Sequence, residues 1–197
     1  MLYEKGIARR KLLLDTTLSL LRERSLETIS LHQIAKVAGI PSSSAYHFFS
    51  GMQDILTALV ERFGEEIIEV ITAPYPPETR KSWQHLYAAA VDRAVSIYQK
   101  TPAYCALILS PHSPPALKLS DRENDMALGI LFVQILQQHF TLPDIPAFTE
   151  KLFYSIEIVD LFFSLSYMYH QQLTDEMIAE AKKAAIAYLE EYLPETL

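Results

Sequence analysis

The chain has 197 residues, half of them hydrophobic and only five of them glycine, so it can bury a sizeable core as one domain or as two small ones. The single cysteine, Cys105, excludes an intrachain disulfide, and with no signal-like N-terminus it indicates a cytoplasmic protein. No membrane span is expected, because the most apolar long stretch, residues 152–169, contains Glu157 and Asp160.

The charge is distributed unevenly along the chain. The net charge is −7, but residues 1–51 carry +3 and the remainder carries −10. A basic end on an acidic body attracts phosphate to that end only, which permits nucleic-acid binding despite the acidic total. The basic run Arg9, Arg10 and Lys11 is explained equally well as a solvated helix face and as a phosphate contact.

The first predicted element is an amphipathic helix over residues 7–24, with Leu14, Leu18 and Leu21 on one face. A second, short helix follows from Leu31, because apolar residues there recur at helical spacing through position 38. Ser30 precedes this helix and Gln33 lies three residues later, which is the pattern of a capping box.

A tight turn and a third helix come next. Gly39 is placed to end the second helix, since glycine adopts positive φ without a steric penalty. Pro41 cannot continue that helix, and Ser42 or Ser43 can cap the following one. The third helix turns Ala45, Phe48 and Phe49 inward and leaves hydroxyl and imidazole groups outward. This shape suits the DNA major groove, although an ordinary helical hairpin is the alternative interpretation.

Residues 34–56, IAKVAGIPSSSAYHFFSGMQDIL, resemble the DNA-binding signature of the TetR family of regulators. The match lies in Ile34, Ala35, Ala38, Gly39, Ile40, Tyr46, Phe49 and Leu56, and it covers about the first quarter of the chain. The resemblance implies an all-α fold of about nine helices. A helix-turn-helix DNA-binding domain (1–51) would be joined by a long helix to a helical effector-binding and dimerisation domain (52–197).

The sequence departs from the family pattern at several positions. Met52 stands where a phosphate-binding Lys is usual, Ser43 where many members have Gly, Ser25 where Gly often closes the first helix, and Ile29 where Thr is common. Loss of the Lys removes one charge-assisted phosphate contact, so we expect weaker and less salt-sensitive operator binding. The residues expected at the DNA are Ser30, His32, Lys36, Pro41, Ser42, Ser43, Ser44, Tyr46 and His47.

The rest of the chain is predicted to be helical throughout. One helix runs without a breaker over residues 52–72, so no flexible linker separates the two halves. Further helices are expected over residues 80–99, over 101–109 with Thr101 as N-cap, over 117–139 as one helix or two, over 149–170 and over 174–193.

The last two helices are the expected dimer interface. The helix over residues 149–170 is apolar nearly all round, and so few helices cannot cover it within one chain. The family resemblance implies the same homodimer, in which the helices over 149–170 and 174–193 form a four-helix bundle. A two-fold dimer predicts an operator of inverted half-sites about one helical turn apart.

An effector site is predicted in the aromatic-rich body, since apolar cavities with few polar groups bind small molecules. Glu157 and Asp160 are either ligands of a cationic or hydroxylated effector, or structural groups that bond across the dimer or to Arg93. Asp92 and Arg93 are read as an ion pair. The candidate ligand residues are Trp83, Tyr87, Tyr98, Tyr104, Cys105, Phe132, Glu157 and Asp160.

Two other kinds of chemistry find little support in the sequence. His112, His139 and His170 lack metal-ligand spacing, so no metal or other cofactor is expected, and no nucleophile–base pair or phosphate loop indicates an enzyme. A lone Cys such as Cys105 is usually core rather than a redox sensor. The sequence therefore predicts a ligand-responsive repressor. The alternative is a helical protein–protein interaction module with a weakened DNA-binding head.

Overall fold

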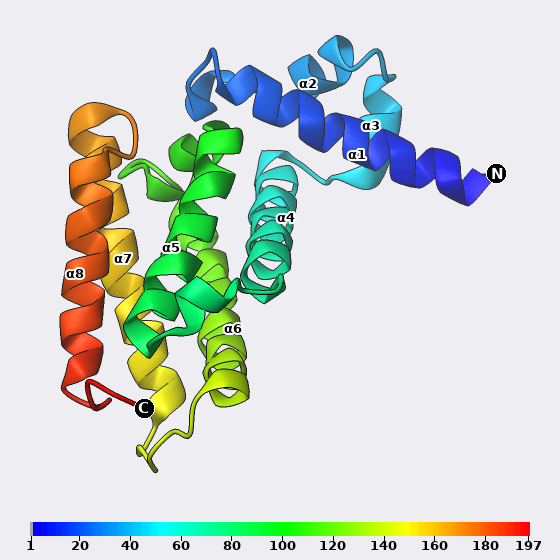
Figure 1. Cartoon of the computed structure of the whole chain (residues 1–197). Helices are drawn as coiled ribbons and strands as arrows, with labels where there is room; N and C mark the ends of the chain where they lie inside the picture. Colours follow the sequence, from blue (N-terminus) through cyan, green and yellow to red (C-terminus); the bar gives the residue numbers. More distant parts are fainter. Residues whose placement is uncertain (1) are drawn as a thin grey trace.

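Eight α-helices follow one another along residues 2–197, the part of the chain that the structure, a computed structural model, describes (Figure 1). They are α1 (Leu2–Leu21), α2 (Leu31–Val37), α3 (Ser42–Phe48), α4 (Met52–Thr72), α5 (Trp83–Lys100), α6 (Pro115–His139), α7 (Phe148–His170) and α8 (Asp175–Glu190). Two 3-10 turns, η1 (Leu26–Thr28) and η2 (Pro77–Arg80), and a π-helical turn, η3 (Cys105–Leu109), complete the order. The described residues contain no strand, so the all-α prediction is confirmed; Met1, within the predicted first domain, lies outside them.

Helices α1, α2 and α3 form the head, which lies across one end of the molecule in Figure 1. Leu13, Leu31, Ile34 and Ala45 are buried between them. The capping box is present, since Ser30 Oγ accepts from the amide of Gln33 and the Gln33 side chain accepts from the amide of Ser30. Gly39 has φ +67°, the left-handed conformation that ends α2 and turns the chain toward α3.

The start of α3 differs from the prediction that Ser42 or Ser43 would cap it. Pro41 occupies the N-cap position, and no side chain caps the helix. Ser42 is the first helical residue, and its hydroxyl is hydrogen-bonded to His32 instead. The turn is therefore one residue tighter than expected, because the fixed φ of proline is already compatible with entry into a helix.

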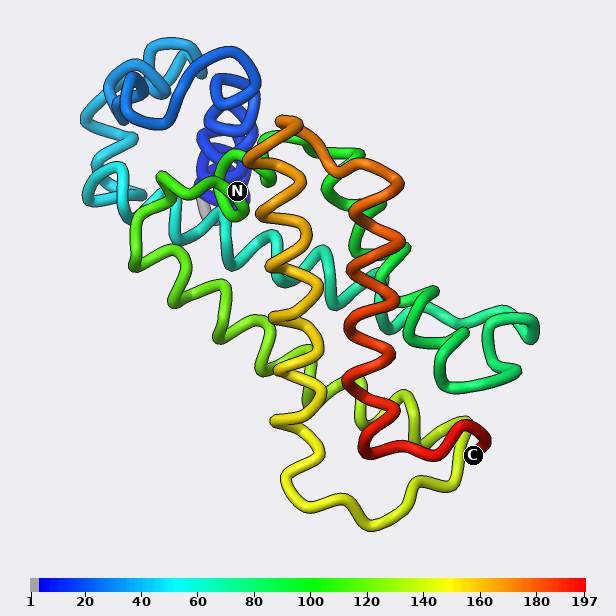
Figure 2. The backbone as a smooth tube through the Cα atoms, turned by 90° about the vertical axis from the view of Figure 1, so that its left-hand side faces the viewer, coloured from blue at the N-terminus to red at the C-terminus, as the bar shows by residue number. Residues whose placement is uncertain are grey.

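Helices α4 to α8 form the body, and α4 runs from the head into it (Figure 1). α7 packs along α8, α6 lies between α7 and α4, and α5 packs on α4. Figure 2 shows α7 and α8 antiparallel on the face turned toward the viewer, with the head at one end. The long predicted helix over residues 52–72 has these same bounds in the structure.

Several other helix bounds differ from the prediction. α1 begins at Leu2 and ends at Leu21, and α5 begins only at Trp83, where Ser82 caps it after η2. Thr101 has both roles: its amide donates to the carbonyl of Ile97 at the end of α5, and its carbonyl accepts from the amide of Tyr104 where the next helical segment begins. The predicted helical segment through Leu109 is therefore present, but its last five residues are wound as the π-helical turn η3, which packs against α4, α6 and α7.

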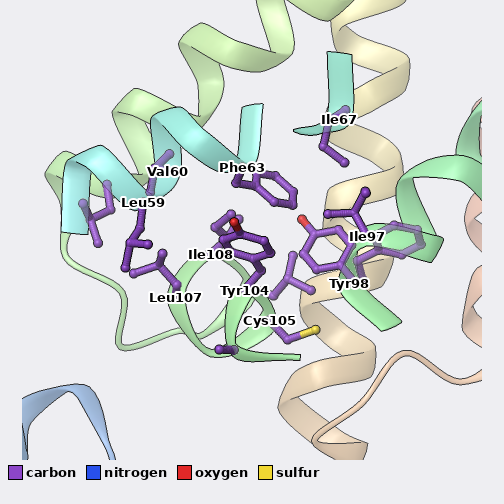
Figure 3. Packing of buried hydrophobic residues seen from close by; sticks show 14 of the residues in the cluster. Leu59, Val60, Phe63, Ile67, Ile97, Tyr98, Tyr104, Cys105, Leu107 and Ile108 are labelled. Atoms are coloured by element: carbon purple, nitrogen blue, oxygen red, sulfur yellow. The ribbon is translucent and has the colours of Figure 1, made fainter. Parts of the chain in front are cut away.

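The core is continuous where α4 meets α5 and η3 (Figure 3). The ring of Phe63 lies 5.0 Å from the ring of Tyr98 and 5.0 Å from that of Tyr104, measured between centroids. Leu59 and Leu107 are fully buried nearby. Because aromatic contacts of this kind add to the burial of apolar surface, they stabilise the packing of α4 against the body.

The expected ion pair between Asp92 and Arg93 is absent. Asp92 pairs with Lys182 of α8. Arg93 donates to the carbonyls of Ala73 at 2.6 Å and Pro74 at 2.8 Å, and its guanidinium lies 3.6 Å from the centroid of the Tyr75 ring. Neighbouring residues on a helix point in different directions, so each of the two reaches a different partner helix or loop. Arg93 thereby binds the exposed C-terminal end of α4.

By length and composition alone, α7 could cross a membrane, and it is the one helix among the described residues that meets this test. Core helices of soluble proteins meet it too, and α7 packs on both α6 and α8.

Candidate nucleic-acid interface and effector cavity

One face of α3 points away from the head. Ser43, Tyr46 and His47 are exposed, whereas Ala45 and Phe49 are buried against α1 and α2. Tyr46 is 54% exposed, so its phenol is open to solvent on this face. Hydroxyl, phenol and imidazole groups on a short exposed helix can donate to or accept from base edges and phosphates.

The other residues predicted at the DNA lie around this face. Ser30, His32, Lys36 and Pro41 are exposed, whereas Ser42 and Ser44 are half-buried. His32 Nδ1 and Ser42 Oγ are hydrogen-bonded at 2.9 Å, and this bond ties the first turn of α2 to the first turn of α3. The structure thus gathers all nine predicted residues on the two helices and their flanking turns.

Basic residues of α1 lie near the same end of the head. Arg9, Arg10 and Lys11 are exposed, and the Arg10 guanidinium lies 5.3 Å from the centroid of the Phe49 ring, directly after α3. Met52 is the first residue of α4, so a lysine at this position would lie at the helix start beside the turn that follows α3. The Asp54 carboxylate accepts from the amide of Ser50 at 2.8 Å and secures that turn.

The body contains an apolar cavity of about 90 Å³ between four of its helices. Its walls include Phe63 and Ile67 of α4, Tyr87 and Tyr98 of α5, Leu128 and Phe132 of α6, and Leu152 and Phe163 of α7. Asp125 of α6 and Asp160 of α7 supply its carboxylates. Four of the eight predicted ligand residues therefore line it: Tyr87, Tyr98, Phe132 and Asp160.

The other four predicted ligand residues lie outside this lining. Trp83 donates from its indole nitrogen to the carbonyl of Pro194 at 2.8 Å, and it secures the C-terminal segment. Tyr104 donates to Glu66 at 3.1 Å. Glu157 pairs with Arg122 at 3.1 Å, rather than with Arg93. Burial raises the pKa of the Cys105 thiol to about 12, so this thiol is protonated and a poor redox sensor at neutral pH.

Two of the residues that line the cavity, Tyr87 and Tyr98, are tyrosines with a buried hydroxyl. Tyr87 donates to Ser155 Oγ at 3.0 Å, and Ser155 in turn donates to the carbonyl of Leu152 at 2.7 Å. Burial raises the pKa of both Tyr87 and Tyr98, and the negative charge of Asp160 raises both further. Both phenols are therefore neutral polar groups within an otherwise apolar wall.

Three carboxylates meet beside the cavity. Each of Asp121, Asp125 and Asp160 contributes an oxygen, and these oxygens lie within 4.8 Å of one another. Burial, followed by the charge of Glu157, raises the pKa of Asp121 to about 7, although Arg122 opposes the shift. Burial likewise raises the pKa of Asp125 and Asp160, and the neighbouring carboxylates raise both further.

This carboxylate cluster was not predicted from the sequence. Asp121 and Asp125 are four residues apart on one helix, a spacing that places both on the same face. That spacing was an available signal, but α6 reads as an ordinary amphipathic helix with acids on it. Asp160 joins them from α7, a contact that depends on how the two helices pack.

An exposed helix after a glycine turn, a basic first helix and a rigid helix leading into a cavity-bearing body define a helix-turn-helix DNA-binding regulator. Comparison with protein families agrees. The family described as "Bacterial regulatory proteins, tetR family" matches residues 13–59, and the "Tetracyclin repressor-like, C-terminal domain" matches residues 81–193. The chain belongs to the TetR family of DNA-binding transcriptional regulators.

Solved structures show the same fold. A TetR-family transcriptional regulator from Streptomyces coelicolor is 21% identical, with a TM-score of 0.71 over 94% of this chain and 99% of that one. The fatty acid degradation regulator FadR from Bacillus halodurans is 13% identical, with a TM-score of 0.68 over 92% and 94%. SmeT, the repressor of a multidrug efflux pump of Stenotrophomonas maltophilia, is 16% identical, with a TM-score of 0.64 over 94% and 91%. No curated protein sequence matches the chain.

Proposed function

We propose that this regulator is a repressor that a small molecule in the body cavity releases from its operator. The observation that carries the proposal is the position of α4, whose residues Phe63, Ile67 and Ile71 form part of the cavity wall. The same helix begins at Met52, four residues after α3 ends at Phe48. A ligand that enlarges the cavity therefore displaces the helix that carries the DNA-binding face.

A chain of polar contacts supports this coupling. Tyr104, at the start of η3 in the body, donates to Glu66 of α4. Glu66 accepts from Arg62 Nε at 2.9 Å, and Arg62 Nη1 lies 2.5 Å from the Asp15 carboxylate of α1 in the head. A groove of about 460 Å³ beside these residues, between α1 and α4, leaves room for the head to tilt. Head and body are thus joined by polar contacts as well as by the chain itself.

In this proposal the two predicted domains bind different partners: residues 1–51 bind the DNA, and residues 52–197 bind the ligand and the partner subunit. Tyr46, Ser43 and His47 would enter the major groove, and exposed basic residues of α1 would contact phosphates. We place the protein in the cytoplasm, where such a regulator meets its operator.

We also propose that the dimer forms through α7 and α8, as the family resemblance implies. Tyr154, Leu161 and Met168 are exposed apolar residues along one face of α7, spaced by seven residues. Such a stripe marks a helix–helix interface when a partner covers it. In Figure 2 both helices lie on the outer face of the body, so a second copy can approach them.

The test is a mobility-shift titration with DNA that flanks the gene, with and without candidate effectors. Salt-sensitive binding to one inverted repeat is expected, and an effector should weaken it. Met52 stands where a phosphate-binding Lys is usual, and it supports the alternative of a protein–protein interaction module with a weakened DNA-binding head. Absent or salt-independent DNA binding would favour that alternative.

A matched variant tests the coupling. Tyr104→Phe removes only the hydroxyl that binds Glu66, so it should leave effector binding unchanged and reduce the effect of the effector on operator affinity. Tyr75→Phe, which removes a tyrosine hydroxyl without a hydrogen-bond partner and lies outside α7 and α8, is the control. Equal responses in the wild type and Tyr104→Phe would exclude this polar route.

A further inference from the structure

The carboxylate cluster contains a buried oxygen without a partner. The side chain of Asp125 is only 6% exposed, and its Oδ2 has no hydrogen-bond partner. Asp125 also lines the apolar cavity, so this residue belongs to both the cluster and the cavity wall. A buried carboxylate without a partner is costly, and a structure that keeps one has a reason to do so.

The charges nearby do not neutralise the cluster. Arg122 is the nearest cation, but it pairs with Glu157, and half of its side chain faces solvent. The phenols of Tyr87 and Tyr98, which Asp160 influences, are neutral and bring no positive charge. Asp121, Asp125 and Asp160 therefore stand together as groups that either remain protonated or require a cation from outside the chain.

The surroundings distinguish between kinds of cation. Small divalent metals such as Mg²⁺ keep several water ligands and need a polar environment for them. Here the wall beside Asp125 and Asp160 is made of Tyr98, Phe132 and Phe163 and of aliphatic side chains. Aromatic faces attract an organic ammonium group and pack against its hydrocarbon part.

We infer that the cavity binds a small organic cation. Its ammonium group would lie between the carboxylates of Asp125 and Asp160, with Asp121 behind them, and its apolar part would fill the aromatic cavity. This inference rests on the proposed effector site and names the chemical class of its ligand. The cavity of about 90 Å³ is smaller than the roughly 150 Å³ cavity that accommodates benzene, so most ligands must push the helices apart.

The position of the cluster gives such a ligand a direct effect on α4. Asn124 lies next to Asp125 on α6, and its side-chain amide donates to the carbonyl of Val60 on α4 at 3.2 Å. At Gly64 of α4, an added Cβ would lie 2.6 Å from the Asn124 side chain, so the two helices approach as closely as glycine permits. Movement of Asp125 toward an ammonium group is therefore transmitted to α4 through Asn124.

The experiment compares two molecules with one carbon skeleton. Isobutylammonium chloride and isobutanol differ in charge but hardly in shape, and sodium chloride at equal ionic strength controls for salt. Melting temperatures of the full-length protein at pH 7.5 should rise with isobutylammonium and stay unchanged with isobutanol or sodium chloride. Asp125→Asn and Asp160→Asn should each weaken ammonium binding roughly ten- to hundred-fold. Glu123→Gln, at an exposed acid of the same helix, should not.

Three outcomes would overturn the inference: no shift with isobutylammonium, an equal shift with isobutanol, or unchanged binding in both Asn variants. A shift with magnesium chloride but not with isobutylammonium would also overturn it, because the cluster would then be a metal site. A mobility shift of the same preparation without ligand tests the proposed function separately. Operator binding without ammonium binding would reject only the ligand class.

Discussion

The carboxylate cluster makes the stability of the free protein depend on pH in an unusual direction. The pKa of Asp121 is raised from 3.8 to about 7 by burial and by the Glu157 charge, with Asp125 and Asp160 close by and Arg122 opposing. A raised carboxyl pKa means that the folded state holds its proton more tightly than the unfolded state. The stabilising contribution is therefore complete below about pH 4 and is lost as the pH rises through about 7.

The magnitude follows from the shift. A pKa difference of about three, at about 1.4 kcal/mol for each pH unit, lowers the free energy of unfolding by about 4 kcal/mol between pH 4 and pH 7.5. Asp121→Asn places a neutral group of the same shape there, so the variant should be more stable than the wild type by only about 1 kcal/mol at pH 4.5 and by about 4 kcal/mol at pH 8. For a chain of this size, 1 kcal/mol changes the melting temperature by about 2–4 °C, so we expect the melting temperature of the variant at pH 8 to exceed that of the wild type by up to about 15 °C.

Thermal unfolding followed by circular dichroism, at pH 4.5, 6, 7 and 8 and at one protein concentration, measures this effect. The quantity compared is the difference in melting temperature between variant and wild type, because most other carboxylates titrate alike in both proteins. Glu123→Gln, exposed on the same helix, should show a difference near zero at every pH. A difference between Asp121→Asn and the wild type that stayed constant, or shrank, as the pH rose would refute the reasoning.

Three further predictions concern DNA binding and assembly. Tyr46→Ala should weaken operator binding roughly ten- to hundred-fold in an anisotropy titration without lowering the melting temperature, and unchanged affinity would remove Tyr46 from the interface. Met52→Lys should restore a phosphate contact, strengthening binding and steepening the slope of log affinity against log salt by about 0.9 per subunit; an unchanged slope would count against that contact. Leu161→Arg should shift a dimer to monomer in sedimentation velocity, whereas Leu119→Arg, at an exposed leucine of α6, should not; a dimeric Leu161→Arg would place the interface elsewhere.

Much of the head could be predicted because its signals are local. The capping box at Ser30, the left-handed Gly39 and the outward face that holds Tyr46 all depend on residues within a few positions of one another. The error at Ser42 is also informative. Its hydroxyl suits a cap in isolation, but His32, ten residues earlier, provides a better partner once the two helices pack.

The body was predictable as a set of helices but not as a site. Helical periodicity and breakers such as the prolines before α6 identify where helices lie, within a few residues. Periodicity does not say which face of one helix meets which face of another. For this reason the sequence could not show that Glu157 pairs with Arg122 rather than with Arg93. It also could not show that Trp83 and Tyr104 form hydrogen bonds outside the cavity lining.

The sequence alone thus determined that the chain is all-helical, with a helix-turn-helix head continuous with a rigid fourth helix, because caps, turns and amphipathic spacing act over a few residues. Only the tertiary structure decided that Asp160 of α7 meets Asp121 and Asp125 of α6 beside an apolar cavity. That meeting depends on the angle and register at which two helices pack, which in turn depend on close contacts such as Gly129 of α6 against the backbone of Phe153 of α7.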